Sequence, residues 1–235
     1  MLKCHKIGED IMTTNTLNQS ESLKNITKLS FKEEMWNSIT HGVMALALLI
    51  VYPYVAIRAF NQGGTHLAVG DSIFILSLFS MFLGSTLYHA MPYDTEHKYV
   101  FRILDHVFIF VAIAGTYTPI ALTVLPPALG YTIVALQWAM TLFGIFYKIF
   151  SKKAGSKVSL IIYLAMGWMA VFLVPSLIKS TSPMFIALLI MGGVMYSIGA
   201  WFYAQKDRKY FHTIWHIFIN LASICHFVGI VFFMV

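Results

Sequence analysis

Seven long apolar segments constrain the fold of this chain more than any other feature of its sequence. They cover residues 36–60, 71–91, 100–122, 128–149, 158–178, 184–204 and 212–235. Each is long enough to cross about 30 Å of hydrocarbon as a helix. Hydrophobic residues make up 58% of the 235 residues and charged residues only 11%, against roughly 25% charged in a soluble domain. A soluble core of this size cannot bury so much apolar surface. The sequence therefore predicts an all-α integral membrane protein, a bundle of seven transmembrane helices.

The connections between the apolar segments are short, which predicts that consecutive helices pack as antiparallel neighbours in one domain, residues 32–235. Residues 1–31 are rich in Ser, Thr, Asn and Lys and lack an apolar core. We expect a flexible polar tail there, neither a signal peptide nor a span. The net charge of +6 does not indicate nucleic-acid binding, because the basic residues fall between the apolar segments.

The positions of the basic residues predict the orientation of the bundle. Fourteen lie in the N-terminal tail or around the second, fourth and sixth connections: Lys3, Lys6, Lys24, Lys28, Lys32, Lys98, Arg102, Lys148, Lys152, Lys153, Lys157, Lys206, Arg208 and Lys209. The opposite side has only Arg58 and Lys179. By the positive-inside rule, this ratio places the N-terminus in the cytoplasm and the C-terminus outside the cell membrane.

His212 and His216 open the last apolar segment and indicate a metal site. Residues four apart lie on one face of a helix, one turn above the other. Helices use this spacing to offer two imidazoles to one metal ion, and an ionisable pair at a membrane boundary is a functional candidate. The alternative is a pair of interfacial side chains that hydrogen-bond to lipid headgroups and loops.

The predicted orientation brings polar groups from four helices to one cytoplasmic layer, which favours the metal site. These groups are Glu34, Asn37 and His41 in the first span, Ser85 and His89 in the second, Asp105 in the third, and His212 and His216 in the seventh. Three histidines with one open position are typical of a catalytic zinc site. A nearby carboxylate either binds the metal or takes the proton of its water.

Three of the other polar residues have a structural alternative. Asp105 is costly inside a span, and it could instead form an ion pair with Arg102, three residues earlier. Ser85 could donate to the zinc water or to an oxyanion, or bond back to a carbonyl of its own helix. His41 could support a metal ligand or be a structural histidine.

Four motifs, taken together, resemble the hemolysin III family. They are Glu34-x-x-Asn37-x-x-Thr40-His41, Ser85-x-x-x-His89, the Asp105 segment with Ala114-Gly115-Thr116-Tyr117-Thr118-Pro119, and His212-x-x-x-His216. That family is similar to the progestin and adipoQ receptors and, more distantly, to the alkaline ceramidases. The resemblance runs from about residue 30 to the C-terminus. It implies a seven-helix bundle with a cytoplasmic-side zinc held by His89, His212 and His216. It also implies that Asp105 hydrogen-bonds the zinc water and that Ser85 lies beside it.

Two functions remain open at this stage. The first is a membrane-embedded zinc hydrolase that acts on an amide or ester of a membrane lipid, with Asp105 and Ser85 as catalytic residues. The second is a non-enzymatic membrane protein with a structural zinc, either a sensor of lipid state or a cytolytic factor of the kind that the family name implies. Few charges in the spans argue against a wide aqueous pore within one chain.

Overall fold

Every apolar segment of the sequence is helical in the computed structural model, which describes residues 28–150, 156–205 and 207–235. The elements are α2 (Phe31–Ala90), α3 (Glu96–Thr123), α4 (Pro127–Phe150), α5 (Ser156–Trp168), the 3₁₀ segment η1 (Met169–Leu173), α6 (Val174–Ser180), α7 (Pro183–Ala204), α8 (Phe211–Val228) and the π-helical turn η2 (Gly229–Phe233). No strand occurs in these residues. The predicted all-α class is confirmed. Of the predicted tail, 1–31, residues 1–27 lie outside the described residues.

Six helices are long and apolar enough to cross a membrane. One of them, Lys157–Ser180, combines α5, η1 and α6, and another, Phe211–Phe233, combines α8 with η2. The chain is therefore a multi-pass membrane protein.

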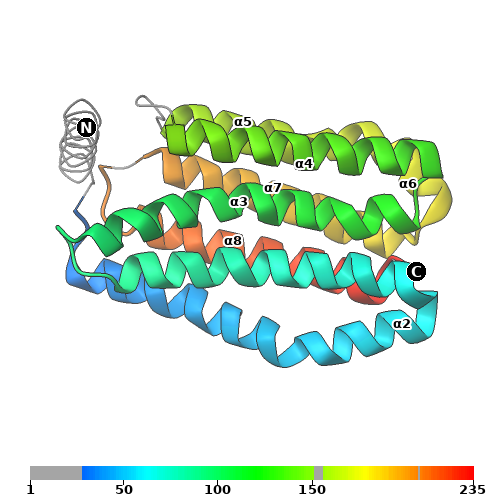
Figure 1. Cartoon of the computed structure of the whole chain (residues 1–235), viewed down its shortest axis with the longest axis horizontal. Helices are drawn as coiled ribbons and strands as arrows, with labels where there is room; N and C mark the ends of the chain where they lie inside the picture. Colours follow the sequence, from blue (N-terminus) through cyan, green and yellow to red (C-terminus); the bar gives the residue numbers. More distant parts are fainter. Residues whose placement is uncertain (1–27, 151–155, 206) are drawn as a thin grey trace, which may run out of the picture.

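The longest of these helices, α2, folds back on itself at Gly64. The backbone there has φ 65° and ψ −156°, a conformation that glycine adopts readily and other L-residues do not. The legs on either side, 31–63 and 65–90, run antiparallel and side by side (Figure 1). Across them the Ser38 hydroxyl donates to the Thr86 carbonyl at 3.2 Å. The sequence predicts two spans separated by residues 61–70; in the structure that connection is itself helical on both sides of the glycine.

A capping box starts α2 five residues before the predicted span. Ser30 caps the helix by accepting a hydrogen bond from the Glu33 amide, and the Glu33 carboxylate accepts from the Ser30 amide at 3.0 Å. This is the S-x-x-E signature of a helix N-terminus. The early start places both Glu33 and Glu34 in the first turn, where negative charge also stabilises the helix dipole.

Small residues let the second leg of α2 pack tightly against α3. A Cβ atom on Gly115 would lie 2.3 Å from the Ser77 hydroxyl oxygen, and one on Gly70 would lie 2.9 Å from the Cα of Pro119. Because neither distance leaves room for a methyl group, glycine is required at both positions. This interface fixes α3, which carries Asp105, against α2, which carries His89.

The membrane-crossing segment Lys157–Ser180 is an α-helix only in part. Pro175 lacks an amide hydrogen, and its ring clashes with the carbonyl four residues earlier in a regular α-helix. The backbone responds by tightening into the 3₁₀ segment η1 before α6 begins at Val174. The predicted span, 158–178, is therefore one crossing with an internal irregularity.

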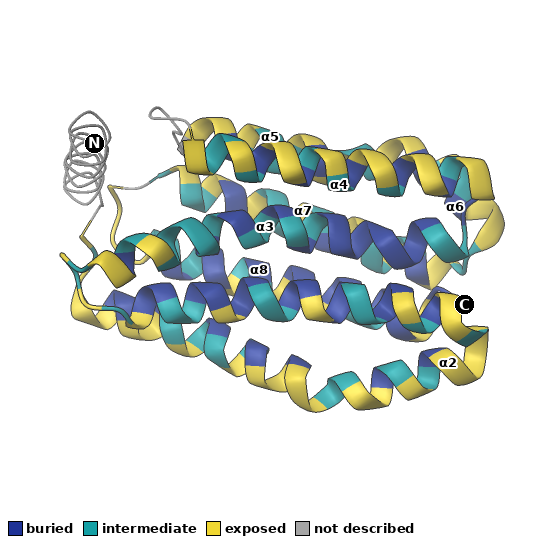
Figure 2. Cartoon of the chain, in the orientation of Figure 1, coloured by how far each residue is buried: buried dark blue, intermediate teal, exposed yellow. Residues whose placement is uncertain are grey.

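The outward faces of the bundle are apolar. Figure 2 shows exposed positions along the outer sides of α2, α4 and α5. They include large hydrophobic side chains such as Ile50 on α2 (71% exposed) and Phe143 on α4 (63%), and Phe172 of η1 is 83% exposed. A surface of this kind belongs against lipid, because no soluble protein leaves so many large apolar groups in water.

Candidate metal centre

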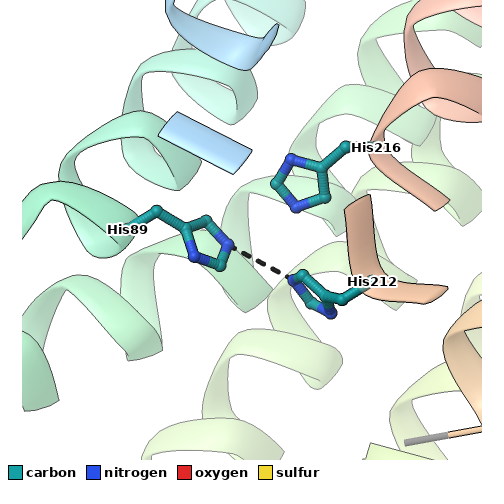
Figure 3. Close-up of side chains that lie close together, drawn as sticks. All are labelled: His89, His212 and His216. Carbon is teal, nitrogen blue, oxygen red and sulfur yellow. Dashed lines mark hydrogen bonds between the residues drawn. The ribbon is translucent and has the colours of Figure 1, made fainter. Parts of the chain in front are cut away.

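Three histidines from α2 and α8 meet at one end of the bundle. Each of His89, His212 and His216 offers a ring nitrogen, and these three atoms lie within 4.8 Å of one another. His89 and His216 are buried and His212 is partly buried. The Nε2 atoms of His89 and His212 are 3.3 Å apart, and the His216 ring lies above them (Figure 3). The cluster could hold a metal ion.

The cluster forms because α8 begins beside both ends of α2. His89 lies in the last turn of α2, and His212 and His216 occupy the first turns of α8. Two side chains from the start of α2 hold α8 there. Asn37 accepts a hydrogen bond from the Thr213 hydroxyl at 2.6 Å.

Glu33 makes the second attachment of α8. Its Oε1 accepts a hydrogen bond from the backbone amide of Tyr210 at 2.6 Å. Tyr210 caps α8 in the left-handed region, with φ 62°, and has no side-chain cap of its own. The Glu33 carboxylate therefore satisfies an amide at the start of α8 that would otherwise lack a partner.

Glu34 fixes the orientation of His89. Its Oε2 lies 2.5 Å from the Nδ1 of His89. A carboxylate accepts hydrogen bonds, so Nδ1 carries the proton of this contact and Nε2 is left with its lone pair directed at the other histidines. This carboxylate–histidine arrangement is typical of metal-binding histidines.

The other oxygen of Glu34 is held by two residues that follow α2. The ammonium of Lys98 donates to Oε1 at 2.9 Å, and the hydroxyl of Tyr93 donates to the same oxygen. Burial, together with the negative charge of Glu34, raises the pKa of the Tyr93 hydroxyl, so this group remains a proton donor. Lys98 is fully buried. Lys98 is one of the fourteen basic residues in the positive-inside count, and the structure shows that its charge is buried.

His216 is enclosed without conventional partners. It is 0% exposed, and neither ring nitrogen has a hydrogen-bond partner among the described residues. The ring of His41 stacks on it, with centroids 3.7 Å apart and planes 14° apart. His41 also meets the edge of the Phe82 ring and likewise makes no hydrogen bond through its ring nitrogens in the described chain. Buried polar atoms normally have partners, so unpaired nitrogens beside two other histidines are what a site for a cation requires.

Asp105 and Ser85 lie next to the cluster. Asp105 is buried on α3, and like Ser85 it lines the cavity beside the cluster. The Ser85 hydroxyl lies beside that carboxylate without a well-formed hydrogen bond to it, and it makes none to its own helix. The back-bond alternative for Ser85 is therefore not what the structure shows. On the other side, the Nδ1 of His106 lies 3.7 Å from Asp105.

A cavity of about 220 Å³ extends from this polar end into the bundle. His41, Ser85 and Asp105 line one end, and apolar and aromatic side chains of α3, α5, α7 and α8 line the rest. The lining continues to His226, ten residues beyond His216 on α8 and thus about 15 Å farther along the helix. This apolar chamber therefore reaches the neighbours of the histidine cluster, namely His41, Ser85 and Asp105, and its lining does not include the three clustered histidines themselves.

The structure brings together all of the residues that the sequence singles out: Glu34, Asn37, His41, Ser85, His89, Asp105, His212 and His216. Sequence reasoning misses Glu33, Tyr93 and Lys98. Two signals were available: the S-x-x-E spacing for Glu33, and a seven-residue spacing that places Lys98 on the same face of α3 as Asp105.

The chain is similar in sequence to known proteins. The model of a family described as haemolysin-III related matches residues 29–227. The chain is 37% identical to a hemolysin-3 homolog of Bacillus subtilis over 88% of this chain and 96% of that protein. It is 34% identical to hemolysin-3 of Bacillus cereus over 86% and 92% of the two chains. A more distant relative is the human monocyte to macrophage differentiation factor, 27% identical over 67% of each chain.

No solved structure gives a significant match. The family model covers most of the chain, and the two Bacillus relatives match it over nearly their whole length. The chain therefore belongs to the haemolysin III-related family of multi-pass membrane proteins.

Proposed function

We propose that this protein is a membrane-embedded, zinc-dependent hydrolase that acts on an amide or ester bond of a lipid. One observation carries the proposal: a buried carboxylate and a serine hydroxyl line one end of an apolar chamber inside a membrane protein, and a cluster of three histidines lies beside them. A binding site for an apolar molecule therefore adjoins a set of groups suited to hydrolysis.

The donor set fits zinc. Zinc prefers imidazole nitrogens at about 2.0–2.1 Å in a tetrahedral arrangement, so two of its ligand atoms lie roughly 3.3 Å apart. The Nε2 atoms of His89 and His212 are separated by this distance. Three histidines leave a fourth position open, which is typical of catalytic rather than structural zinc. When bound, the ion would act as a Lewis acid that activates water and polarises a carbonyl oxygen.

The side chains around the cluster would perform the proton transfers. The Asp105 carboxylate borders the chamber and is placed to accept a proton from the attacking water and return it to the leaving group. The Ser85 hydroxyl has no fixed partner and so remains free to donate a hydrogen bond to a developing oxyanion. Glu34 keeps the Nδ1 proton of His89 in place.

The chamber favours a lipid as the substrate. Apart from the polar groups near the cluster, its walls are largely aliphatic and aromatic, including Leu164, Val171 and Ile190. An acyl chain would gain free energy by entering such walls from water, and it would lose little by entering them from the bilayer. We therefore infer that the bond to be cleaved belongs to a membrane lipid that carries a long apolar chain.

We also propose that the chain crosses the membrane seven times, with its N-terminus in the cytoplasm and its C-terminus outside. The two legs of α2 are each long enough to cross, and they lie side by side (Figure 1). Fourteen of the sixteen basic residues fall in the N-terminal tail or around the second, fourth and sixth connections of this topology, which supports a cytoplasmic histidine cluster. The burial of Lys98 removes one charge from this count and leaves the asymmetry large.

A structural metal is the competing function. It is favoured by the fact that the histidines come from only two helices, so an ion would clamp α8 to α2. On this view the protein is not an enzyme, and it acts as a sensor of lipid state or as a cytolytic factor. Asp105 and the chamber would then have no chemical task.

Asp105→Asn compared with His212→Ala separates the two functions. Asparagine has nearly the same shape as aspartate but cannot accept a proton as a base, and removal of a general base lowers rates by about 10²–10⁴-fold. We expect Asp105→Asn to retain zinc and to lose hydrolysis, whereas His212→Ala loses both. The assay follows release of a labelled fatty acid from a panel of lipid amides and esters, with zinc measured in the same membrane preparation.

Asp71→Asn is the matched control. Asp71 is also a buried aspartate of the membrane domain, 3% exposed, but it lies near the opposite end of the bundle. We expect its substitution to leave hydrolysis unchanged. Full activity of Asp105→Asn would eliminate the assigned base and return the structural metal to first place.

A further inference from the structure

Lys98 is the most unusual residue of the cluster, because it is a lysine with no exposed surface. It lies in the first turns of α3, beyond the helix cap Thr95. Most lysines extend their charge into water, and a buried ammonium is strongly disfavoured unless it is paired and hydrogen-bonded. A charge in this position therefore has a specific partner.

The surroundings of Lys98 satisfy its ammonium completely. Two of its hydrogens point to oxygen atoms, Oε1 of Glu34 and the backbone carbonyl of Tyr88, each at 2.9 Å. Two aromatic rings cover the remaining sides, with the nitrogen 4.3 Å from the Tyr88 ring centroid and 4.5 Å from that of Tyr93. Rings at this distance attract a cation through their negative faces. The ammonium is thus fixed in one position.

The only charged partner of Lys98 among the described ion pairs is the carboxylate that orients His89. Glu34 uses Oε1 for Lys98 and Tyr93, and Oε2 for the Nδ1 of His89. With Oε1 held from two directions, the carboxylate cannot rotate away from His89. The chain of contacts runs from α3 through the start of α2 to the end of α2, and it ends at the histidine cluster.

We infer that Lys98 is a positioning residue for the metal centre: it holds Glu34, which in turn keeps the Nε2 of His89 directed at His212 and His216. The inference rests on the proposed function only in that it takes the histidine cluster to bind zinc. One face of α3 would then carry both the positioning residue Lys98 and the proposed base Asp105, because the two are seven residues apart. Helix α3 thereby sets both the metal ligand and the proposed base.

A purely structural ion pair between α2 and α3 is the competing explanation. Such a pair would affect thermal stability but not the affinity of the folded protein for zinc. A positioning residue affects that affinity, and it does so only through Glu34. Partners of metal-binding histidines typically change metal affinity by about 10–100-fold, and Lys98 acts one step farther out.

The test measures the zinc dissociation constant of the full-length protein in detergent by competition with a coloured chelator. Lys98→Met keeps the length of the side chain and removes its charge, and we expect it to weaken zinc binding by about tenfold. Lys32→Met is the matched control, because Lys32 is an exposed lysine in the first turn of α2, two residues from Glu34. Its affinity for zinc should match that of the wild type.

A double-mutant cycle decides between the two explanations. If Lys98 acts through Glu34, adding Lys98→Met to Glu34→Gln should change the zinc dissociation constant by less than about twofold. It should also raise the melting temperature above that of Glu34→Gln alone, because the single variant leaves a buried ammonium without its carboxylate. If Lys98→Met does not fold, Tyr93→Phe removes the other donor to Oε1 and should weaken zinc binding in the same direction.

Two results would overturn the inference: wild-type zinc affinity in the variant of Lys98, or the full tenfold loss in the Glu34→Gln background. A wild-type protein that binds no zinc would overturn the inference and the proposed function together. A wild-type protein that binds zinc but hydrolyses no lipid would contradict only the proposed function, and the comparison of Lys98 with Lys32 would still stand.

Discussion

Two adjacent glutamates hold the two halves of the histidine cluster. Glu33 closes the capping box of α2 and accepts the Tyr210 amide, so it fixes where α8 begins. Glu34 accepts from His89 and so fixes the ring at the end of α2. Because the two side chains point in different directions from consecutive positions of one helical turn, the start of α2 positions all three histidines.

The unpaired ring nitrogens in and beside the cluster favour the binding of a cation. A buried imidazole without hydrogen bonds is costly, yet His216 and His41 stack with all four ring nitrogens lacking partners in the described chain. A cation beside His216 would satisfy one of these atoms and offset part of that cost. Folding and metal binding would then be thermodynamically coupled.

At the scale of the elements, the contact between α2 and α3 determines how closely Asp105 approaches His89. The contact depends on Gly115, where a Cβ would lie within 2.4 Å of two side-chain atoms of Ser77 and 3.3 Å from the Ile73 carbonyl. The hydroxyls of Thr116 and Thr118 bond to carbonyls four residues earlier, each at 2.8 Å. Helix α3 therefore packs closely against α2 on one side, and the threonine hydroxyls near its proline are hydrogen-bonded to its own backbone carbonyls.

We predict that Gly115→Ala destabilises the bundle and that Gly193→Ala does not. The added methyl group of the first variant overlaps Ser77, and overpacking of this kind costs about 1–3 kcal/mol. At Gly193 a Cβ meets nothing within 4 Å. The measurement is the melting temperature of each purified variant in the same detergent. Equal melting temperatures for the two variants would show that the α2–α3 contact is looser than described.

The elements also show what a sequence can predict. Length and hydropathy predict each membrane-crossing segment, because burial in lipid demands about 20 apolar residues in a helix. They do not predict that α2 continues through residues 61–70 with a turn confined to Gly64. Of the three glycines in α7, Gly192 and Gly199 contact α8 closely and Gly193 faces open space. The sequence pattern alone cannot show which of these glycines contacts α8, because that depends on how α7 is rotated about its own axis.

The candidate site also contains residues that the sequence can predict and one that it cannot. The four-residue spacing of His212 and His216 and the common depth of His89 and Asp105 follow from helix geometry and topology. Lys98 could not be found by composition, because a lysine near a helix end usually faces water. Only the tertiary contact with Glu34 shows that it is buried.

At the scale of the whole molecule, the number of crossings determines where the cluster faces. The first described residues and the C-terminus lie at opposite ends of the bundle (Figure 1). Seven crossings put the two termini on opposite sides of a membrane, whereas six would put them on the same side. The positions of the two ends in the bundle are those expected of an odd number of crossings.

Reporter fusions at the two termini test the topology. We predict that a reporter after Val235 is exposed outside the cell and that one before Met1 remains in the cytoplasm, because most basic residues fall in the N-terminal tail or around alternate connections of the sequence. A reporter that reads only in the extracellular space and a second that reads only in the cytoplasm serve as mutual controls. Two termini on the same side would refute seven crossings.

The measurement that tests the account most directly is the metal content of the purified protein. We predict about one zinc per chain in wild-type protein prepared without chelators, and most of it lost in His89→Ala, His212→Ala and His216→Ala, since two histidines rarely hold zinc as three do. His226→Ala is the control, because His226 is a buried histidine of the same helix α8 outside the cluster. It should retain the full zinc content. A wild-type protein without zinc, or three cluster variants that keep it, would contradict the account.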